Sequence, residues 1–263
     1  METEGPGANV AALPSRIVTE RLTKLVAEVG PTRPAACCAG SAGAEVPAAR
    51  ARLEKLLARL LPGSRICVVH DTRLVLAAAD LEEGIALIAG TGSVAYGRAA
   101  DGREAQAGGW GWLVGDDGGG AWITREAVRE VMRRVDAGRP PGPLGDGLLD
   151  ACGARDPREM IEKMHGLHEP MRWAALASIV FDVADRDAAA QGVIRRAASE
   201  LRGLVDTVRR SLSIDGPVVL AGGLLLNQPR LESAVRDEVA GRCIRLQEPP
   251  VYGAVRLAEE LLH

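Results

Sequence analysis

The chain has 263 residues, of which 47% are hydrophobic and 25% charged, and its formal net charge is −3. This length and composition predict a globular protein built as one large domain or two lobes. The small, mixed charge argues against a nucleic-acid partner, and every apolar stretch is too short to cross a membrane. The first residues lack the pattern of a secretory signal, so a cytoplasmic location is expected.

In the first part of the chain, apolar residues recur with helical spacing in three segments and form short runs in two others. The predicted helices cover residues 15–29, 45–61 and 73–79, and the predicted strands cover residues 35–39 and 66–69. The second strand ends at His70-Asp71.

From residue 85 the pattern changes to a small antiparallel meander, with Asp101-Gly102 as a hairpin turn. Its predicted strands are residues 85–90, 93–98 and 104–107. Beyond it we expect a helix over 121–136, a Pro/Gly-rich linker over 138–145 and three or four helices within 148–213. The last part of the chain is predicted to form strands over 218–221 and 243–246, and helices over 229–240 and 251–262. Strands that alternate with helices in both halves predict an α/β protein with mixed sheets.

The five cysteines are odd in number, and their spacing fits no zinc or iron–sulfur pattern. They are Cys37, Cys38, Cys67, Cys152 and Cys243. We expect small, buried, apolar side chains in a reducing compartment.

An apolar run from Ile85 to Ala89 leads directly into Gly90-Thr91-Gly92-Ser93. Glycines let backbone N–H groups approach an anion, and the hydroxyls of Thr91 and Ser93 add donors. We interpret this segment as a phosphate-binding hairpin, with a plain tight turn as the alternative. It also matches the dinucleotide fingerprint, but that motif needs a helix immediately after the turn. The sequence contains neither a P-loop with its lysine nor the protein-kinase signature set.

Acidic residues stand at two informative places. Asp71 follows a predicted strand, where ligand crevices form in α/β lobes, and is a candidate general base toward a sugar hydroxyl. Its alternative role is an N-cap for the next helix. Asp116 and Asp117 lie among glycines ahead of a helix. They are predicted to bind a ligand or metal-bound water, and the alternative is a first-turn pair that complements the helix dipole.

Glycines and tryptophans supply further candidates. Gly222-Gly223 follows an apolar strand, and exposed backbone there can lie flat against a planar ring, although an ordinary strand exit is the alternative. Trp110, between glycines, is a candidate ligand contact, whereas Trp122 and Trp173 fall on helical faces and are expected to pack. His70 is expected to be structural rather than a ligand contact.

With these residues identified, the chain resembles the N-acetylglucosamine kinase branch of the BadF/BadG/BcrA/BcrD-type ATPase family, within the sugar kinase, Hsp70 and actin superfamily. The resemblance runs from about Gly5 to the C-terminus and is most specific over residues 88–122, with support from residues 218–229 and 249–261. It implies a two-lobe actin-like ATPase fold of the ribonuclease H-like kind, with ATP and sugar in the cleft between the lobes. The expected N-terminal lobe is residues 1–82 completed by the helix 251–263, and residues 83–250 form the nucleotide- and sugar-binding lobe.

The resemblance also implies roles for single residues. Asp71 matches the aspartate that takes the proton from the acceptor hydroxyl. Thr91, with Gly90 and Gly92, matches the second phosphate loop, and Ser93 is assigned to the cofactor with them. On the nucleotide side, Gly222 and Gly223 match the adenosine motif, and Ala174 matches a position in the adenine pocket. On the sugar side, Asn9 matches a sugar-contacting asparagine, and the sugar-binding turn is matched by Gly109, Trp110, Gly111 and Asp116. The implied cofactors are ATP and Mg²⁺, with no direct protein ligand for the metal.

The chain departs from the family pattern in specific ways. Family members begin with an Asp-Gly-Gly-Gly-Thr loop that holds the γ-phosphate and magnesium waters, and this chain has none. We therefore expect a first lobe that is incomplete at its N-terminus, with a marginal two-stranded sheet and exposed apolar helix faces. A start codon placed too late is the favoured explanation, and an inactive relative is the alternative. The other departures are His70 for asparagine, Asp117 for glutamate and Gly119 for serine.

The predicted activity is ATP-dependent phosphorylation of an amino sugar such as N-acetylglucosamine, with the sugar as the small-molecule partner. Neither nucleic acid nor a membrane is an expected partner, and a homodimer is compatible with the family. One alternative is a BadF-type ATPase that activates a reductase or dehydratase through an iron–sulfur cluster, for which the cysteines are poorly placed. The other is a catalytically impaired relative that binds nucleotide or sugar.

Overall fold

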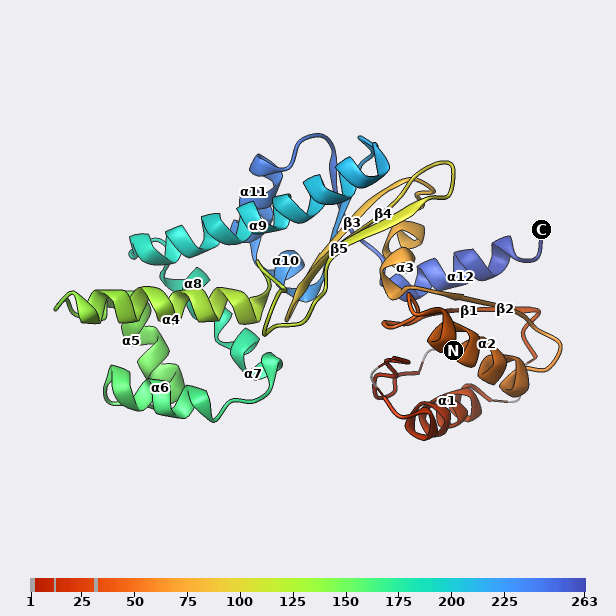
Figure 1. The fold of residues 1–263 in the computed structure, drawn as a ribbon, viewed down its shortest axis with the longest axis horizontal. Coiled ribbons are helices and arrows are strands. Elements are labelled where there is room, and N and C mark those ends of the chain that lie inside the picture. The colour runs from red at the N-terminus through yellow and green to blue at the C-terminus, as the bar shows by residue number, and fades with distance from the viewer. Residues whose placement is uncertain (1–2, 12, 31–32) are drawn as a thin grey trace. The chain divides into compact units, whose positions relative to one another are not determined.

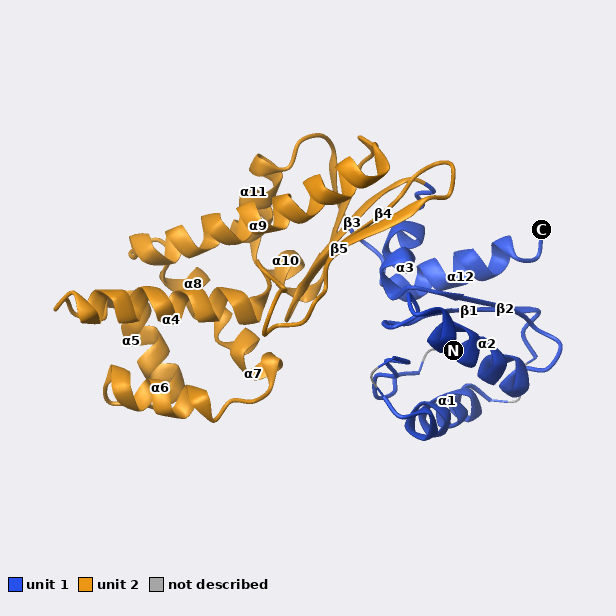
Figure 2. Ribbon diagram, in the orientation of Figure 1, with its two compact units in different colours: residues 1–82, 246–263 blue, residues 83–245 orange. Residues whose placement is uncertain are grey.

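The computed structural model describes residues 3–11, 13–30 and 33–263 (Figure 1). The chain divides into two compact units, residues 1–82 with 246–263, called unit 1, and residues 83–245, called unit 2 (Figure 2). Each unit combines a β-sheet with helices, as the alternating sequence pattern predicts. No helix in the described part of the chain is long and apolar enough to span a bilayer.

Unit 1 is built on two parallel strands, β1 (Ala36–Gly40) and β2 (Arg65–Val69), which pair residue by residue along their whole length. Helices α1 (Ser15–Val29) and α2 (Pro47–Leu60) contribute Val18, Leu53 and Leu57 to a cluster that also buries Val68 of β2. Successive side chains of a strand point to opposite faces of the sheet, so the neighbouring Val69 belongs to a different cluster.

That second cluster joins the sheet to α3 (Asp71–Ala78) and α12 (Pro250–Glu260) through Leu74 and Leu257. Gly253 of α12 allows this approach, because a Cβ there would lie 2.7 Å from the backbone nitrogen of Ala78. The C-terminal helix is therefore an integral layer of unit 1.

Unit 2 contains a five-stranded mixed sheet in the order β5-β4-β3-β6-β7. Its strands are β3 (Gly84–Ala89), β4 (Ser93–Arg98), β5 (Glu104–Gly108), β6 (Val218–Ala221) and β7 (Cys243–Arg245). The first three form the predicted antiparallel meander, and β6 pairs in parallel with β3 on one side and β7 on the other. The apolar runs of β3 and β6 are buried, as expected for strands covered on both faces.

The helices of unit 2 differ from the prediction in number and limits. They are α4 (Gly120–Asp136), α5 (Gly142–Cys152), α6 (Pro157–His165), α7 (Pro170–Ala175), α8 (Ala177–Val183), α9 (Ala188–Leu212), α10 (Gly223–Asn227) and α11 (Pro229–Glu238). The predicted linker at 138–145 is too long, because α5 already begins at Gly142 and proline is tolerated in a first helical turn. Five helices rather than three or four lie between residues 142 and 212, and α10 was not predicted.

Candidate functional site

The turn Gly90–Ser93 joins β3 to β4, and its first residue closes the hairpin by donating its N–H to the Gly92 carbonyl at 2.9 Å. A strand therefore follows the turn where a dinucleotide site would need a helix. The prediction of a hairpin at this position is confirmed.

The N-terminus of α4 packs against this turn. The N–H of Gly120 donates to the Gly90 carbonyl at 2.9 Å, and the N–H of Ala121 donates to the Thr91 carbonyl at 3.1 Å. The approach is so close that a Cβ on Gly119 would lie 2.6 Å from the carbonyl carbon of Gly92. In the part of the chain that the structure describes, no hydrogen bond uses the Thr91 hydroxyl or the N–H groups of Thr91 and Gly92. Donors of this kind are what an anion-binding turn presents.

Ser93 plays a different part from Thr91. Its side chain is buried, and its hydroxyl donates to the Asp117 carbonyl at 2.7 Å. The single O–H of Ser93 thus anchors the segment that carries Asp116 and Asp117 to the hairpin.

Asp116 connects two predicted parts of the site. Its carboxylate accepts an N–H from Gly111 at 3.2 Å and another from Ser93, and so links the glycine turn 109–111 to the phosphate turn. A Cβ on Gly92 would lie 2.5 Å from the Asp116 carboxyl carbon, so this contact requires glycine at position 92. Burial raises the pKa of Asp116, while the two N–H donors oppose that rise.

The alternative role of the Asp116-Asp117 pair, as first-turn partners of the helix dipole, is wrong. Helix α4 is capped at Gly119 and has no acidic residue in its first turn. Asp117 instead forms an ion pair with Arg125 at 3.6 Å, and that arginine also donates to the Trp112 carbonyl at 3.2 Å. Arg125 was not predicted, because no sequence motif marks its contacts with Asp117 and Trp112.

Replacing Asp116 with asparagine should raise the stability of unit 2 at neutral pH. The amide oxygen can still accept from Gly111 and Ser93, but no charge remains to be desolvated. Because the folded-state pKa of Asp116 is raised, the wild type loses stability as pH rises through it, so the gain should fade below about pH 4. Denaturant midpoints across pH measure this gain. Asp150→Asn, at an exposed position of α5 in the same unit, is the control, and a lower midpoint for Asp116→Asn at pH 7 would contradict the expectation.

The tryptophans divide as predicted between packing and exposure. Trp122 is 8% exposed, and the Trp173 indole N–H donates to the Leu167 carbonyl at 2.9 Å, so both are packing residues. Trp110 is 78% exposed, between two glycines with positive φ. Its face is available for contact with a ligand.

The residues predicted to contact the nucleotide gather where β3 and β6 end. Gly222 follows β6 with φ +92°, and a Cβ there would overlap the carbonyl oxygen of Ala89, the last residue of β3. On the other side of the turn, a Cβ on Gly120 would lie 3.0 Å from the Ala174 Cβ and 3.2 Å from the Gly90 oxygen. Gly223 begins α10 directly after Gly222.

In unit 1, Asn9 and Asp71 line one cavity of about 380 Å³ with Gly40 and Ser41. The Asn9 side-chain oxygen accepts the Ala11 N–H at 3.0 Å, which holds its segment in a turn. This segment is joined to the loop after β1, because the Val10 N–H donates to the Ala42 carbonyl at 3.3 Å. The structure thus brings together two residues that lie 62 positions apart in sequence.

His70 organises the surroundings of Asp71. Its Nε2 lies 3.3 Å from a Glu45 oxygen, and its Nδ1 lies 3.1 Å from an Asp71 oxygen. The same Nδ1 accepts the Thr72 N–H at 3.4 Å, so His70, and not Asp71, caps α3. The N-cap alternative for Asp71 is therefore wrong, and the structural role expected for His70 is confirmed. Glu45 was not identified from sequence.

Replacing His70 with alanine should destabilise unit 1 by about 1 kcal/mol, because α3 then loses its side-chain cap. His70→Asn should retain most of the stability, since asparagine is a favourable capping residue. Urea denaturation of the two variants measures the difference. Equal midpoints for alanine and asparagine would show that the cap contributes nothing.

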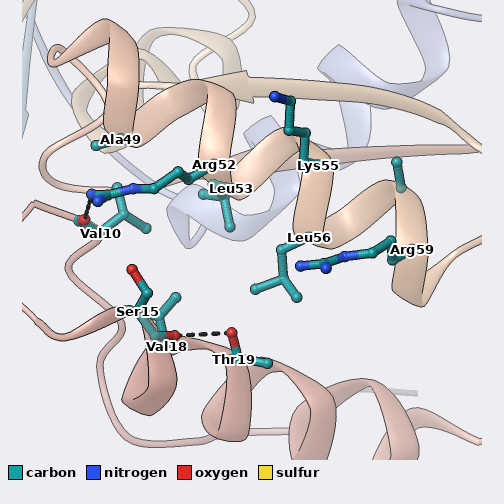
Figure 3. A pocket seen from close by; sticks show the side chains of 11 residues that line it. Val10, Ser15, Val18, Thr19, Ala49, Arg52, Leu53, Lys55, Leu56 and Arg59 are labelled. Carbon is teal, nitrogen blue, oxygen red and sulfur yellow. Dashed lines mark hydrogen bonds between the residues drawn. The ribbon is translucent and has the colours of Figure 1, made fainter.

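A larger cavity, of about 500 Å³, lies between α1 and α2 (Figure 3). Leu53, Leu56 and Val18 line it together with the basic side chains of Arg52 and Arg59. None of the predicted site residues lines it. Size alone therefore does not identify the site.

The described residues contain no group of three or more His, Cys, Asp or Glu side chains that could hold a metal ion. A magnesium ion that keeps several waters and is held mainly by phosphate oxygens needs no such group.

Comparisons with known proteins identify a family and similar kinases. A family model described as the BadF/BadG/BcrA/BcrD ATPase family matches residues 5–258. An N-acetylmuramic acid/N-acetylglucosamine kinase from Clostridium acetobutylicum is 29% identical over 234 residues, which are 85% of this chain and 76% of the relative.

Two solved structures of putative N-acetylglucosamine kinases resemble this protein along 97% of its chain. The one from Chromobacterium violaceum has a TM-score of 0.71 at 26% identity and is covered to 88%. The one from Porphyromonas gingivalis has a TM-score of 0.74 at 21% identity and is covered to 89%. The predicted actin-like ATPase fold is confirmed by this similarity.

Proposed function

Because the chain belongs to the BadF/BadG/BcrA/BcrD ATPase family, we propose that it is an ATP-dependent kinase for an amino sugar such as N-acetylglucosamine. The observation that carries the proposal is the connection made by Asp116. One carboxylate holds the glycine turn 109–111, assigned to the sugar, against the hairpin turn 90–93, assigned to phosphate. A donor and an acceptor site built side by side suit group transfer. The name of the Clostridium relative supports the choice of substrate.

In this proposal the triphosphate of ATP binds at Gly90–Gly92. Support comes from the Thr91 hydroxyl and from the N–H groups of Thr91 and Gly92, which the described part of the protein does not use. Ser93 contributes by fixing the Asp117 segment, because its hydroxyl donates to the Asp117 carbonyl and is therefore not available to the phosphate. The adenosine is assigned to Gly222, Gly223 and Ala174, which adjoin the same turn. Mg²⁺, when bound, would neutralise charge on the transferring phosphoryl group.

Asp71 is assigned as the general base. The acceptor hydroxyl of the sugar loses its proton to the Asp71 carboxylate while its oxygen bonds to the γ-phosphorus, and the bond to the ADP oxygen breaks. The Asp71 side chain is 49% exposed in the cavity that Asn9 shares, so a substrate can reach it. Asn9, Gly109, Trp110, Gly111 and Asp116 are assigned to the sugar.

A coupled ADP-release assay with Mg²⁺ and a panel of sugars tests this function. N-acetylglucosamine or N-acetylmuramic acid should stimulate ADP release, and glucose should stimulate it less. ATP hydrolysis of equal rate with and without every sugar would refute the proposal and favour an ATPase of another kind. Tight binding of sugar without ADP release would favour a non-catalytic relative.

A further inference from the structure

Two cysteines lie directly opposite each other on the two strands of unit 1. Cys38 of β1 is the register partner of Cys67 of β2. Neighbouring strands are about 4.8 Å apart, which falls within the Cα separations that disulfides span, about 4.4–6.8 Å. Both side chains are half-buried and pack against the cluster of Val69, Leu74 and Leu257. They therefore share one face of the sheet as well as one register position.

The two sulfurs already interact in the reduced protein. Their mutual interaction lowers the pKa of Cys67 and raises that of Cys38. Burial opposes the first shift, whereas the positive charge of Arg73 on α3 and of Arg50 on α2 favours it and Glu54 opposes it. The lowered pKa favours the thiolate form at Cys67.

The remaining cysteines lack this arrangement. Burial raises the pKa of the Cys37, Cys152 and Cys243 thiols. Cys37 is adjacent to Cys38 in sequence, but alternation along the strand places it on the opposite face of the sheet. Nucleophilic reactivity of a cysteine follows its thiolate fraction. Reactivity should therefore concentrate at Cys67.

From this placement we propose that Cys38 and Cys67 form a redox-active dithiol that small hydroperoxides oxidise to a disulfide. The Cys67 thiolate attacks the O–O bond, which breaks to give a sulfenic acid at Cys67 and releases water or an alcohol after protonation. The Cys38 sulfur then bonds to the Cys67 sulfur, and the sulfenic oxygen leaves as water with the Cys38 proton. Two electrons pass from the thiols to one peroxide, and a dithiol reductant reverses the change.

The test treats the full chain with a small excess of hydrogen peroxide, alkylates the remaining thiols and maps the peptides by mass spectrometry. The expected result is a protein with three alkylated cysteines and a peptide pair joined through Cys38 and Cys67, both restored by dithiothreitol. A wild-type protein that keeps five alkylated cysteines, or that forms a disulfide through Cys37, would overturn the proposal.

Single variants identify the role of each sulfur. Cys67→Ser should slow thiol loss about tenfold or more, because the reactive thiolate is gone. Cys38→Ser should still oxidise at Cys67 and accumulate a sulfenic acid that dimedone traps. Cys37→Ser is the matched control and should behave as the wild type. Oxidation of Cys67→Ser at the wild-type rate would contradict the assignment, and the peptide map of the wild type decides the pairing even if a variant folds poorly.

Discussion

Replacing Asp71 with asparagine is expected to lower kcat for sugar phosphorylation by about 10²–10⁴-fold, because an amide cannot take the proton of the acceptor hydroxyl. Asparagine has nearly the same size, and the Asp71 side chain is 49% exposed, so folding should be preserved. The residue does not cap α3, since the His70 ring has that role. Initial rates of sugar-dependent ADP release, with sugar and ATP saturating, measure the effect.

The control for this prediction is Asp150→Asn, an equally small change on an exposed position of α5. It should leave kcat unchanged. If Asp71→Asn turned over sugar at the wild-type rate, the assignment of the base would be wrong, whether or not the chain is a kinase. If Asp71→Asn lost its circular dichroism signal together with its activity, the loss would indicate a folding defect. Asp71→Glu, which keeps a carboxylate, would then help to distinguish a folding defect from the loss of the base.

Gly222→Ala is expected to destabilise unit 2 by about 2–5 kcal/mol, because two costs coincide at this position. The backbone has φ +92° and ψ 143°, a region that residues with a Cβ essentially do not occupy. A Cβ would also lie 2.7 Å from the carbonyl carbon of Ala89, at the ends of the neighbouring buried strands β3 and β6. The atoms that this Cβ would meet belong to the Ala89 backbone, which cannot move aside as the end of a flexible side chain can. Denaturant unfolding of the whole chain measures the loss of stability.

Gly223→Ala is the matched control, one residue further along the chain. Position 223 has no positive φ, and a Cβ there would meet only the Asn227 amide nitrogen at 3.9 Å. Its midpoint should equal that of the wild type or exceed it slightly, since alanine favours helix. Equal midpoints for the two alanine variants would show that the close contact between Gly222 and Ala89 is not needed.

Sequence patterns located most of the secondary structure because the relevant signals are local. The strand predicted at 66–69 and the hairpin around Gly90–Ser93 depend on apolar runs and turn residues a few positions apart. The region 138–165 was less predictable. Prolines near 140 suggested a linker, yet α5 accommodates Pro143 in its first turn, where the missing N–H costs little.

Residues of the candidate site could be identified from sequence where residue type and local position indicate their chemistry. Their contacts could not be predicted where the partners are distant in the chain. Asp71, Thr91 and Asp116 stand out through their positions after strands and among glycines. The hydrogen bond from Ser93 to Asp117 joins residues 24 apart, and Glu45 reaches His70 from another loop. No local pattern encodes these pairs. Histidine is also an uncommon cap, which is why Asp71 was the more obvious candidate.

The most direct test of the proposed kinase activity follows the γ-phosphoryl group itself. The protein is incubated with Mg²⁺, N-acetylglucosamine and ATP that carries heavy oxygen only in its γ-phosphoryl group, and the products are weighed by mass spectrometry. The predicted result is a sugar phosphate that carries the labelled phosphoryl group and forms one-for-one with ADP. Label found only in inorganic phosphate, with the sugar unchanged, would contradict it.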